Sequence, residues 1–350
     1  MEDRVKAGLR GPVESCRTDQ MIYITRCGAA GCDIQPEERR YSATSRYRRD
    51  GQLAEYRQPN PDGSEWASLY AYDAIGRLHE VDIGPGGKSI YQYDHLGHLE
   101  RVITEAADGS QRMDEPFSYD EQNRKSRTLY IEPLAAEIYT AAVCGIEGSD
   151  AAYSARGATS MTTLYNERDQ AIEVQFRDSQ NRVLSRVTLL YDATGRLVEE
   201  CQTTEVREFP PAEIRARMSP AQSRALEELL GNFQQRRVHA YDAEGRCVET
   251  RSTMAPFGED RKTVTYNEHG DPSQESWYCE HKGSSIDEDG HLVEQVEPSN
   301  TRPVGSEVRF TYTYDEQSNW TERVTSIRQQ PDQPYRVSSI DRRILTYYQD

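Results

Sequence analysis

The sequence predicts an all-β protein, a twisted and curved array of antiparallel β-hairpins with a small helical insertion near 211–231. Three observations lead to this prediction. A short phrase recurs along the chain, the phrase has the chemistry of a tight hairpin turn, and the intervals between copies fit pairs of strands. A fixed phrase at a recurring interval indicates a repeat architecture.

The repeated phrase consists of an aromatic residue, an acid, two free positions, a turn residue, a polar residue and an apolar residue. Its cleanest copies begin at Tyr72, Tyr93, Tyr191 and Tyr241. Weaker copies begin at Tyr47, Tyr119, Tyr165, Arg177, Tyr266, Ile286 and Tyr314. Most starts lie about 20 to 28 residues apart, which is the length of two strands and two turns.

The phrase has the composition of a hairpin loop. Asp at the first position of a turn and Gly at the fourth favour a type I turn followed by a left-handed residue, which closes a hairpin with a Gly bulge. The clean copies supply Asp73 with Gly76, Asp94 with Gly97, Asp192 with Gly195, and Asp242 with Gly245. We expect each Asp to face the basic residue after its Gly, a cross-strand pair that contributes about 0.2–1 kcal/mol. We expect each Tyr to face the apolar residue that ends the phrase.

The chain is predicted to have an entry segment and a repeat array. The entry segment covers residues 1–46 and contains the Cys27–Cys32 hairpin, and the array covers residues 47–350 with insertions at 132–161 and 203–235. The first insertion is rich in Gly and is predicted to be mostly loop. In the second insertion, Ser219 suits an N-cap, Pro220 the first helical position and Gly231 the stop. We expect this helical segment to cover an open face or edge of the sheet, with partner docking as the alternative.

The composition excludes several classes of partner. The formal net charge is −17, whereas nucleic-acid binding and anionic membrane surfaces require a basic footprint. No run of 18 apolar residues occurs, so no membrane-spanning segment is predicted. The first residues contain no hydrophobic signal core, as in a mature chain whose signal has been removed. Tyr is the main aromatic residue, with 22 copies against 6 Phe, and its ring can be buried while its hydroxyl stays in water.

The seven cysteines leave alternatives open. Cys27 and Cys32 flank a four-residue loop and could close a hairpin with a disulfide, remain free thiols or bind a metal. No second Cys pair or His pair completes a zinc site. Cys247 occupies the apolar position of its repeat and is interpreted as a small buried hydrophobic residue.

The sequence contains no signature of an active site. We find no nucleophile elbow, P-loop, dinucleotide-binding glycine pattern or zinc helix, and we predict no catalytic residue, cofactor or metal. Asp94, His95 and His98 share one turn, which is more simply a solvated turn than a metal site. Trp66 and Trp277 could stack on sugars, whereas Trp320, the third candidate, takes an apolar repeat position and is expected in the core.

The repeated Tyr-Asp-x-x-Gly-Arg-Leu phrase resembles the YD repeats of the rearrangement-hotspot (RHS) superfamily, from Tyr47 to the C-terminus. The resemblance implies a ribbon of β-hairpins that spirals into a shell. Its large members are polymorphic toxins and insecticidal complexes that enclose a toxic C-terminal domain, and shorter members are cell-surface and secreted proteins. This chain has too few copies to enclose a cargo, lacks the Asp-Pro-x-Gly-Leu signature and has no cargo domain, so toxin delivery is not expected.

These observations predict a non-enzymatic, extracytoplasmic repeat scaffold, secreted or on the cell surface, that acts through protein–protein contact. Its partners would be other proteins or further copies of itself, joined at open β-edges in Tyr41–Tyr47 and Arg342–Tyr348. The alternative is a carbohydrate-binding surface module, with glycans as partners of the aromatic residues. A hydrolase is a weaker alternative.

Overall fold

The computed structural model describes residues 3–28, 31–60, 62–95, 97–114, 117–119, 125–130, 138–155, 157–204, 219–220, 234–255, 258–281, 283–286, 292–295 and 304–349. Antiparallel strands account for most of them, which confirms the predicted all-β class. Of the helical segment predicted near 211–231, only residues 219 and 220 are described. The chain forms two compact units, which we describe separately: unit 1 is Met1–Pro116, Thr265–Glu275 and Glu307–Asp350, and unit 2 is Phe117–Val264 and Ser276–Ser306.

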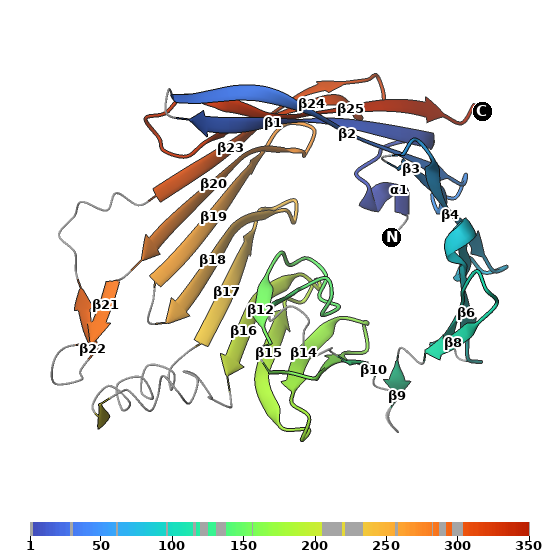
Figure 1. Ribbon diagram of the computed structural model, residues 1–350, viewed down its shortest axis with the longest axis horizontal. Helices are drawn as coiled ribbons and strands as arrows, with labels where there is room; N and C mark the ends of the chain where they lie inside the picture. Colours follow the sequence, from blue (N-terminus) through green and yellow to red (C-terminus); the bar gives the residue numbers. More distant parts are fainter. Residues whose placement is uncertain are drawn as a thin grey trace. The chain divides into compact units, whose positions relative to one another are not determined.

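Unit 1 pairs the first long strand of the chain with the last. Its elements are α1 (Asp3–Lys6), β1 (Val13–Gly28), β2 (Gly31–Tyr47), β3 (Leu53–Pro59), β4 (Glu65–Tyr72), β5 (Leu78–Asp82), the 3-10 turn η1 (Gly84–Gly86), β6 (Lys88–Tyr93), β7 (Leu99–Glu105), β8 (Gln111–Asp114), β23 (Val304–Tyr314), β24 (Trp320–Arg328) and β25 (Arg336–Tyr347). Strands β1 to β8 pair in sequence order, β23 to β25 do the same, and β1 lies between β2 and β25 (Figure 1).

The two edges predicted for self-assembly are not edges. Residues 41–47 belong to β2, which pairs with β1 on one side and with β3 on the other. Residues 342–347 belong to β25, which pairs with β24 and with β1. The prediction of open edges at these segments is therefore wrong, because the entry strand β1 satisfies the backbone groups that both strands would otherwise expose.

Unit 2 continues the hairpin pattern and adds a segment that covers one face of its sheet, residues 138–159, which we call the covering segment. Its strands are β9 (Ser118–Tyr119), β10 (Lys125–Tyr130), β11 (Ile138–Thr140), β12 (Ala152–Ser154), β13 (Ser160–Tyr165), β14 (Ala171–Arg177), β15 (Val183–Tyr191), β16 (Leu197–Thr204), β17 (Gln234–Tyr241), β18 (Cys247–Ala255), β19 (Gly258–Tyr266), β20 (Pro272–His281), β21 (Gly283–Ile286) and β22 (Leu292–Gln295). Three of the four boundaries between the units fall within β19, β20 and β23, and the fourth falls between β8 and β9.

The main core of unit 2 lies between this covering segment, residues 138–159, and one face of the sheet (Figure 1). Alternate residues of a strand point to opposite faces, and in β14 the residues on the covered face, Val174 and Phe176, are fully buried. Cys144, Ile146 and Tyr153 of the covering segment pack against them. The insertion predicted to be mostly loop thus supplies the layer that closes the core.

The repeated turns have one local geometry. Gly76, Gly97, Gly195 and Gly245 have φ values of 84°, 90°, 86° and 82°. In the first of these turns, one carboxylate oxygen of Asp73 accepts hydrogen bonds from the Ile75 and Arg77 amides, and the other lies 2.7 Å from Arg77 Nε. Each Asp holds its turn in this way because a carboxylate can accept several N–H bonds at once.

The other repeats follow this geometry with small changes. The Asp192–Arg196 and Asp242–Arg246 ion pairs are both 2.7 Å long, and the Asp94–His98 pair is 3.2 Å long. Where Gly is missing, Asp169, Asn181 and Ser318 adopt φ values of 59°, 62° and 62°. In the weaker copy that begins at Tyr119, residues 120–124 lie outside the described part of the chain.

A contact between repeats explains why the first residue of the phrase is Tyr. Its hydroxyl donates a hydrogen bond to the carbonyl of the residue that ends an earlier copy of the phrase. This bond joins Tyr72 to Leu53 at 2.8 Å, Tyr93 to Leu78 at 2.8 Å, Tyr191 to Ala171 at 2.8 Å, and Tyr241 to Leu197 at 2.6 Å. The neighbouring hairpin brings this carbonyl within reach of each hydroxyl, a contact that the sequence alone did not predict.

Candidate functional site

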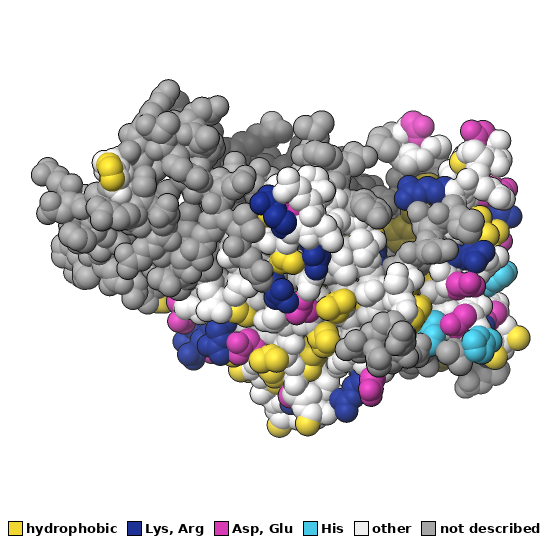
Figure 2. Space-filling view, turned by 90° about the horizontal axis from the view of Figure 1, so that it is seen from below, with side chains coloured by type: hydrophobic (Ala, Val, Ile, Leu, Met, Phe, Trp, Pro, Cys, Tyr) yellow, Lys and Arg dark blue, Asp and Glu magenta, His cyan; other side chains and the backbone are white. Residues whose placement is uncertain are grey.

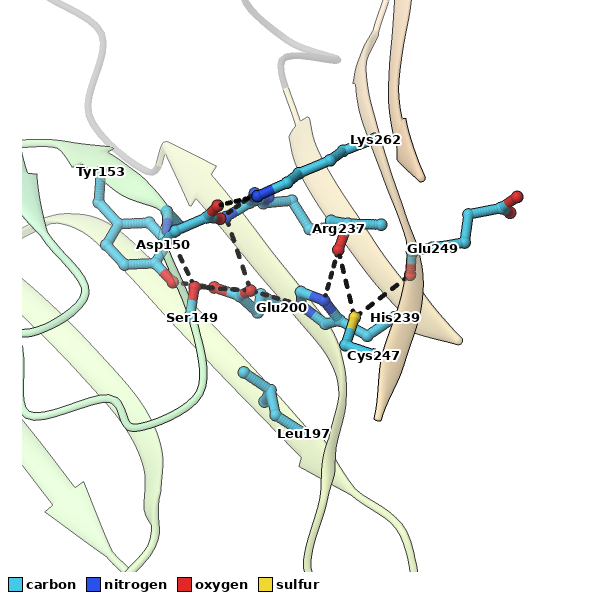
Figure 3. Close-up of polar contacts among 12 residues, drawn as sticks. Ser149, Asp150, Tyr153, Leu197, Glu200, Arg237, His239, Cys247, Glu249 and Lys262 are labelled. Carbon is cyan, nitrogen blue, oxygen red and sulfur yellow. Dashed lines mark hydrogen bonds and ion pairs between the residues drawn. The ribbon is translucent and has the colours of Figure 1, made fainter. Parts of the chain in front are cut away.

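A polar cluster in unit 2 is built around Glu200 of β16, which is 1% exposed (Figure 3). Both carboxylate oxygens lie 2.8 Å from Ser149 Oγ, and the Tyr153 hydroxyl donates to one of them. His239 Nε2 lies 2.7 Å from the other oxygen, and Arg237 approaches to 3.8 Å. A buried carboxylate needs several partners, because an unpaired charge removed from water is costly. The hydrogen bonds around Glu200 supply them.

Three parts of unit 2 supply this cluster. Glu200 and His239 lie on the covered face of β16 and β17, and Ser149 and Tyr153 reach them from the covering segment. The Asp150 carboxylate continues the cluster, 2.7 Å from Arg237 and 3.6 Å from Lys262 of β19. The cluster therefore fastens the covering segment to the sheet.

The electrostatics of the cluster favour a charged pair. Burial alone would raise the pKa of Glu200, but hydrogen bonds from His239, Tyr153 and Ser149 hold it below the usual value. Burial would lower the pKa of His239, yet its hydrogen bonds to Cys247 and Glu200 raise it to about 9. At neutral pH we therefore assign a carboxylate to Glu200 and an imidazolium to His239, whose Nδ1 lies 3.1 Å from Thr250 Oγ1.

Cys247 extends the cluster towards the turn between β17 and β18. It lies opposite Tyr241 and is half-buried, and its Sγ lies 3.6 Å from both Thr250 Oγ1 and the Glu249 carbonyl. Although burial would raise the pKa of this thiol, hydrogen bonds with His239 and Thr250 lower it. The interpretation of Cys247 as a small buried hydrophobic residue is therefore wrong, because the side chain is half-buried and its sulfur contacts the Thr250 hydroxyl.

Sequence reasoning did not find this cluster. Glu200 and His239 match no motif, and their partners Ser149 and Tyr153 come from an insertion without periodicity. One signal was present. In the other three clean copies, the residue two before Tyr is Tyr or Leu and the phrase ends in Leu, whereas the copy at Tyr241 has His239 and Cys247 at these positions.

The residues predicted from the sequence lie at hairpin ends instead. The turns that contain Asp192 and Asp242 are in unit 2, where the Arg196 guanidinium lies 4.9 Å from the centre of the Tyr241 ring. The turns of Asp73 and Asp94 are in unit 1, where Arg77 lies 4.3 Å from the centre of the Tyr93 ring. These contacts hold neighbouring turns together.

The Cys27 and Cys32 backbones lie opposite each other in β1 and β2. Their side chains are outside the described part of the structure, so the disulfide stays a prediction.

A hollow of about 350 Å³ lies on one face of unit 1. It is lined by Thr18, Gln20, Ser42, Ala43, Tyr56, Gln58, Trp320, Arg323, Asp341 and Arg343. Asp341 is 2% exposed and accepts hydrogen bonds from Gln20 at 2.7 Å and from Arg323 at 2.9 Å. Trp320 is 7% exposed, and the Arg343 guanidinium lies 3.6 Å from the centre of its ring.

Comparison with known proteins assigns no family. No family model matches the chain, and no curated protein matches it. A porin-like protein from Bacteroides uniformis aligns over 96% of this chain and 99% of its own, at 11% identity and a TM-score of 0.33. A chain of the Tc holotoxin pore from Photorhabdus luminescens aligns over 87% of this chain and 15% of its own, at 13% identity and a TM-score of 0.27. A transferrin binding protein B mutant from Haemophilus parasuis aligns over 96% and 76%, at 8% identity and a TM-score of 0.22.

These TM-scores are all below 0.5, so we base no argument about fold or function on the similarities. Within the described ranges, no helix is long and apolar enough to cross a membrane.

Proposed function

We propose that this protein is a YD-repeat scaffold that acts outside the cytoplasm by contacting other proteins through a sheet face. The observation that carries the proposal is an apolar row on one face of the unit 1 sheet, in which Met21 of β1, Ile340 of β25 and Val324 of β24 lie opposite one another. Ile344 lies four residues after Ile340 on the same face and is 58% exposed.

Charged pairs of both signs flank this apolar row. Arg17 Nε lies 3.1 Å from Asp19, and Arg342 Nε lies 2.8 Å from Glu322. The row of Asp19, Arg342 and Glu322 lies between the apolar row and Ile344, so apolar side chains and paired charges alternate on this face. Protein–protein contact surfaces combine apolar and polar side chains. On the face that Figure 2 shows, apolar side chains are likewise interspersed with acidic and basic ones.

A photo-reactive amino acid at position 344 of the full chain, expressed in its native host, tests this proposal. We expect covalent cross-links to a protein, either another protein or a second copy, at position 344. The matched control is position 332, an exposed Asp in the loop between β24 and β25. Equal cross-linking at the two positions would contradict contact through this face, and sedimentation velocity over a range of concentrations separates self-association from other partners.

The second candidate function is carbohydrate binding, and the hollow in unit 1 favours it. Tyr56 and Gln58 line this hollow. The 40% exposed Trp66 is not part of its lining, but it lies opposite Gln58 and meets the Tyr56 ring edge to face, with the ring centres 5.9 Å apart. Aromatic faces next to hydrogen-bonding side chains suit a sugar. A glycan array with and without calcium, repeated with Tyr56→Ala, tests this function. Binding that Tyr56→Ala abolishes supports it, and no binding to any glycan excludes it.

A further inference from the structure

We propose that Cys247 is a reactive thiolate, held by His239 and Glu200, that reduces hydroperoxides and is oxidised by them. This inference is independent of the scaffold proposal. It rests on the order of the contacts. Glu200 bonds one side of the His239 ring (Figure 3), and Thr250 Oγ1 lies 3.1 Å from the other ring nitrogen and 3.6 Å from Cys247 Sγ. An acid, a histidine and a cysteine in this order are the arrangement that activates a nucleophilic thiol.

The repeat provides an internal comparison for this cluster. The copy at Tyr191 has Leu189 and Leu197 where the copy at Tyr241 has His239 and Cys247. Glu200 also stands where the two clean copies of unit 1 have Val81 and Val102, nine residues after Tyr. Each change replaces an apolar side chain by a titratable one, and the three titratable side chains belong to one chain of contacts through Thr250. Packing alone does not require titratable residues at these positions, because apolar side chains fill the equivalent positions in the other copies of the phrase.

The other cysteines of the described chain provide a second comparison. Cys16 and Cys144 are buried, and burial raises the pKa of each thiol, that of Cys144 to about 12. Burial also raises the pKa of Cys201, and a hydrogen bond with Asp260 together with burial raises that of Cys279 to about 11. Cys247 differs because its thiol is the one among these whose pKa is lowered, since burial raises it less than hydrogen bonds with His239 and Thr250 lower it, and a lowered pKa makes a thiol reactive.

The reaction balances with groups at this site and one named co-reactant. The Cys247 thiolate attacks one oxygen of the hydroperoxide, so that an S–O bond forms and the O–O bond breaks. The sulfur is oxidised by two electrons to a sulfenic acid, and the peroxide is reduced to an alcohol or to water. The proton for the leaving oxygen comes from solvent water at the partly exposed sulfur, because Glu200 and Thr250 occupy both ring nitrogens of His239.

The titratable and charged groups around the thiol come from three strands. They are Glu200 of β16, Arg237, His239 and Tyr241 of β17, and Glu249 of β18. The Glu249 carboxylate is engaged by Arg251 and by Arg261 at 2.7 Å, and burial raises the pKa of Tyr241. His239 is therefore the group whose charge sets the state of the thiol between pH 5 and 9.

Alkylation of the full, reduced chain tests the thiolate. The protein is treated with limiting iodoacetamide from pH 5 to pH 9, and the rate at each cysteine is measured by peptide mass spectrometry. We expect Cys247 to react about tenfold faster than Cys201 at pH 6, since each unit of pKa changes the thiolate fraction tenfold. Cys201 is the matched control because it is also half-buried and belongs to the neighbouring strand β16. If Cys247 of the unsubstituted chain reacts no faster than Cys201, this result alone overturns the proposal.

The variant His239→Gln separates activation from packing. We expect it to shift the pH profile of Cys247 alkylation upward, towards that of Cys201, while Cys201→Ser leaves the Cys247 profile unchanged. An identical Cys247 profile in a folded His239→Gln protein would show that the histidine does not activate the thiol. Hydrogen peroxide followed by dimedone then tests the substrate class. We expect a dimedone adduct on Cys247 and none on Cys201, and absence of the Cys247 adduct would exclude hydroperoxides.

Discussion

His239 Nε2 and Glu200 Oε1 lie 2.7 Å apart, and the two side chains are 4% and 1% exposed. Removing two charges from water is costly, and the loss is offset only when the remaining hydrogen-bonding positions are filled. Here Ser149 and Tyr153 fill them from the covering segment. The charges of Glu200 and His239 therefore help to hold the covering segment against the sheet and so to close the unit 2 core.

Glu200→Ala is expected to lower the free energy of unfolding by about 3–5 kcal/mol, because it leaves the buried charge of His239 without its partner. Glu200→Gln should cost less, since the amide still accepts hydrogen bonds. Urea unfolding followed by circular dichroism measures both. The control is Glu244→Ala, which removes a side chain that is 64% exposed and pairs with Arg246. Equal losses for Glu200→Ala and Glu244→Ala would contradict a central role for the pair.

Raising the pH should weaken the attachment of the covering segment. The pKa of His239 is about 9 in the folded chain, above its ordinary value of 6.5. The charged pair therefore contributes its full stabilisation below pH 6.5, and this contribution is lost as the pH rises through 9. We expect the urea midpoint to fall between pH 7 and 10 in the native chain and to fall less in His239→Gln. If the urea midpoints of the native chain and of His239→Gln fell in parallel with pH, a group other than His239 would cause the loss of stability.

Gly195→Val should destabilise the β15–β16 hairpin by about 1–2 kcal/mol, because a β-branched residue resists a φ of 86°. An added Cβ would also lie 3.2 Å from Gln170 Nε2, which donates to the Gly195 carbonyl. Thermal unfolding measures the change. Ala193→Val, at an exposed position of the same turn, should stay within about 0.5 kcal/mol of the native chain. Equal effects at the two positions would mean that the backbone conformation is not the cause.

The fold class was predictable because it depends on local chemistry. Asp192, Gly195 and Arg196 determine their turn within five residues, and the recurrence of that turn implies the hairpin array. The pairing of β1 with β25 was not predictable, because it joins the two ends of the chain and leaves no local pattern.

The candidate site was predictable only in part, for the same reason. Cys247 was correctly placed opposite Tyr241, but its chemistry depends on His239 and Glu200, which reach it from other strands. The periodicity that predicts which face a residue occupies does not predict which polar side chains meet there. Ser149 illustrates the limit, since it contacts Glu200 from an insertion with no repeat at all.

The Cys27–Cys32 disulfide remains a prediction, and the register of β1 and β2 is compatible with it because the two backbones are opposite each other. Thiol counting under denaturing, non-reducing conditions, on protein taken from its native host, measures it. We expect five free thiols out of seven. Reduction should cost less than the roughly 3 kcal/mol expected for a fifteen-residue loop, because the loop here is much shorter. Seven free thiols would contradict the disulfide and remove this support for an oxidising location.

Tyr191→Phe tests the contact between repeats. The Tyr191 hydroxyl donates to the Ala171 carbonyl at 2.8 Å, and the half-buried ring contributes packing that Phe retains. The substitution therefore removes one hydrogen bond and should lower the free energy of unfolding by about 0.5–1.5 kcal/mol. Tyr241→Phe should have a similar effect through its bond to Leu197.

The matched control is Tyr278→Phe, at a position that is 42% exposed and outside the repeated phrase, where we expect a change within about 0.5 kcal/mol. Urea unfolding of the three variants under one set of conditions gives the comparison. If Tyr191→Phe and Tyr241→Phe matched Tyr278→Phe, the hydroxyl would contribute nothing to the array. Tyr would then recur in the phrase for its ring alone, and Phe would serve equally well at every copy.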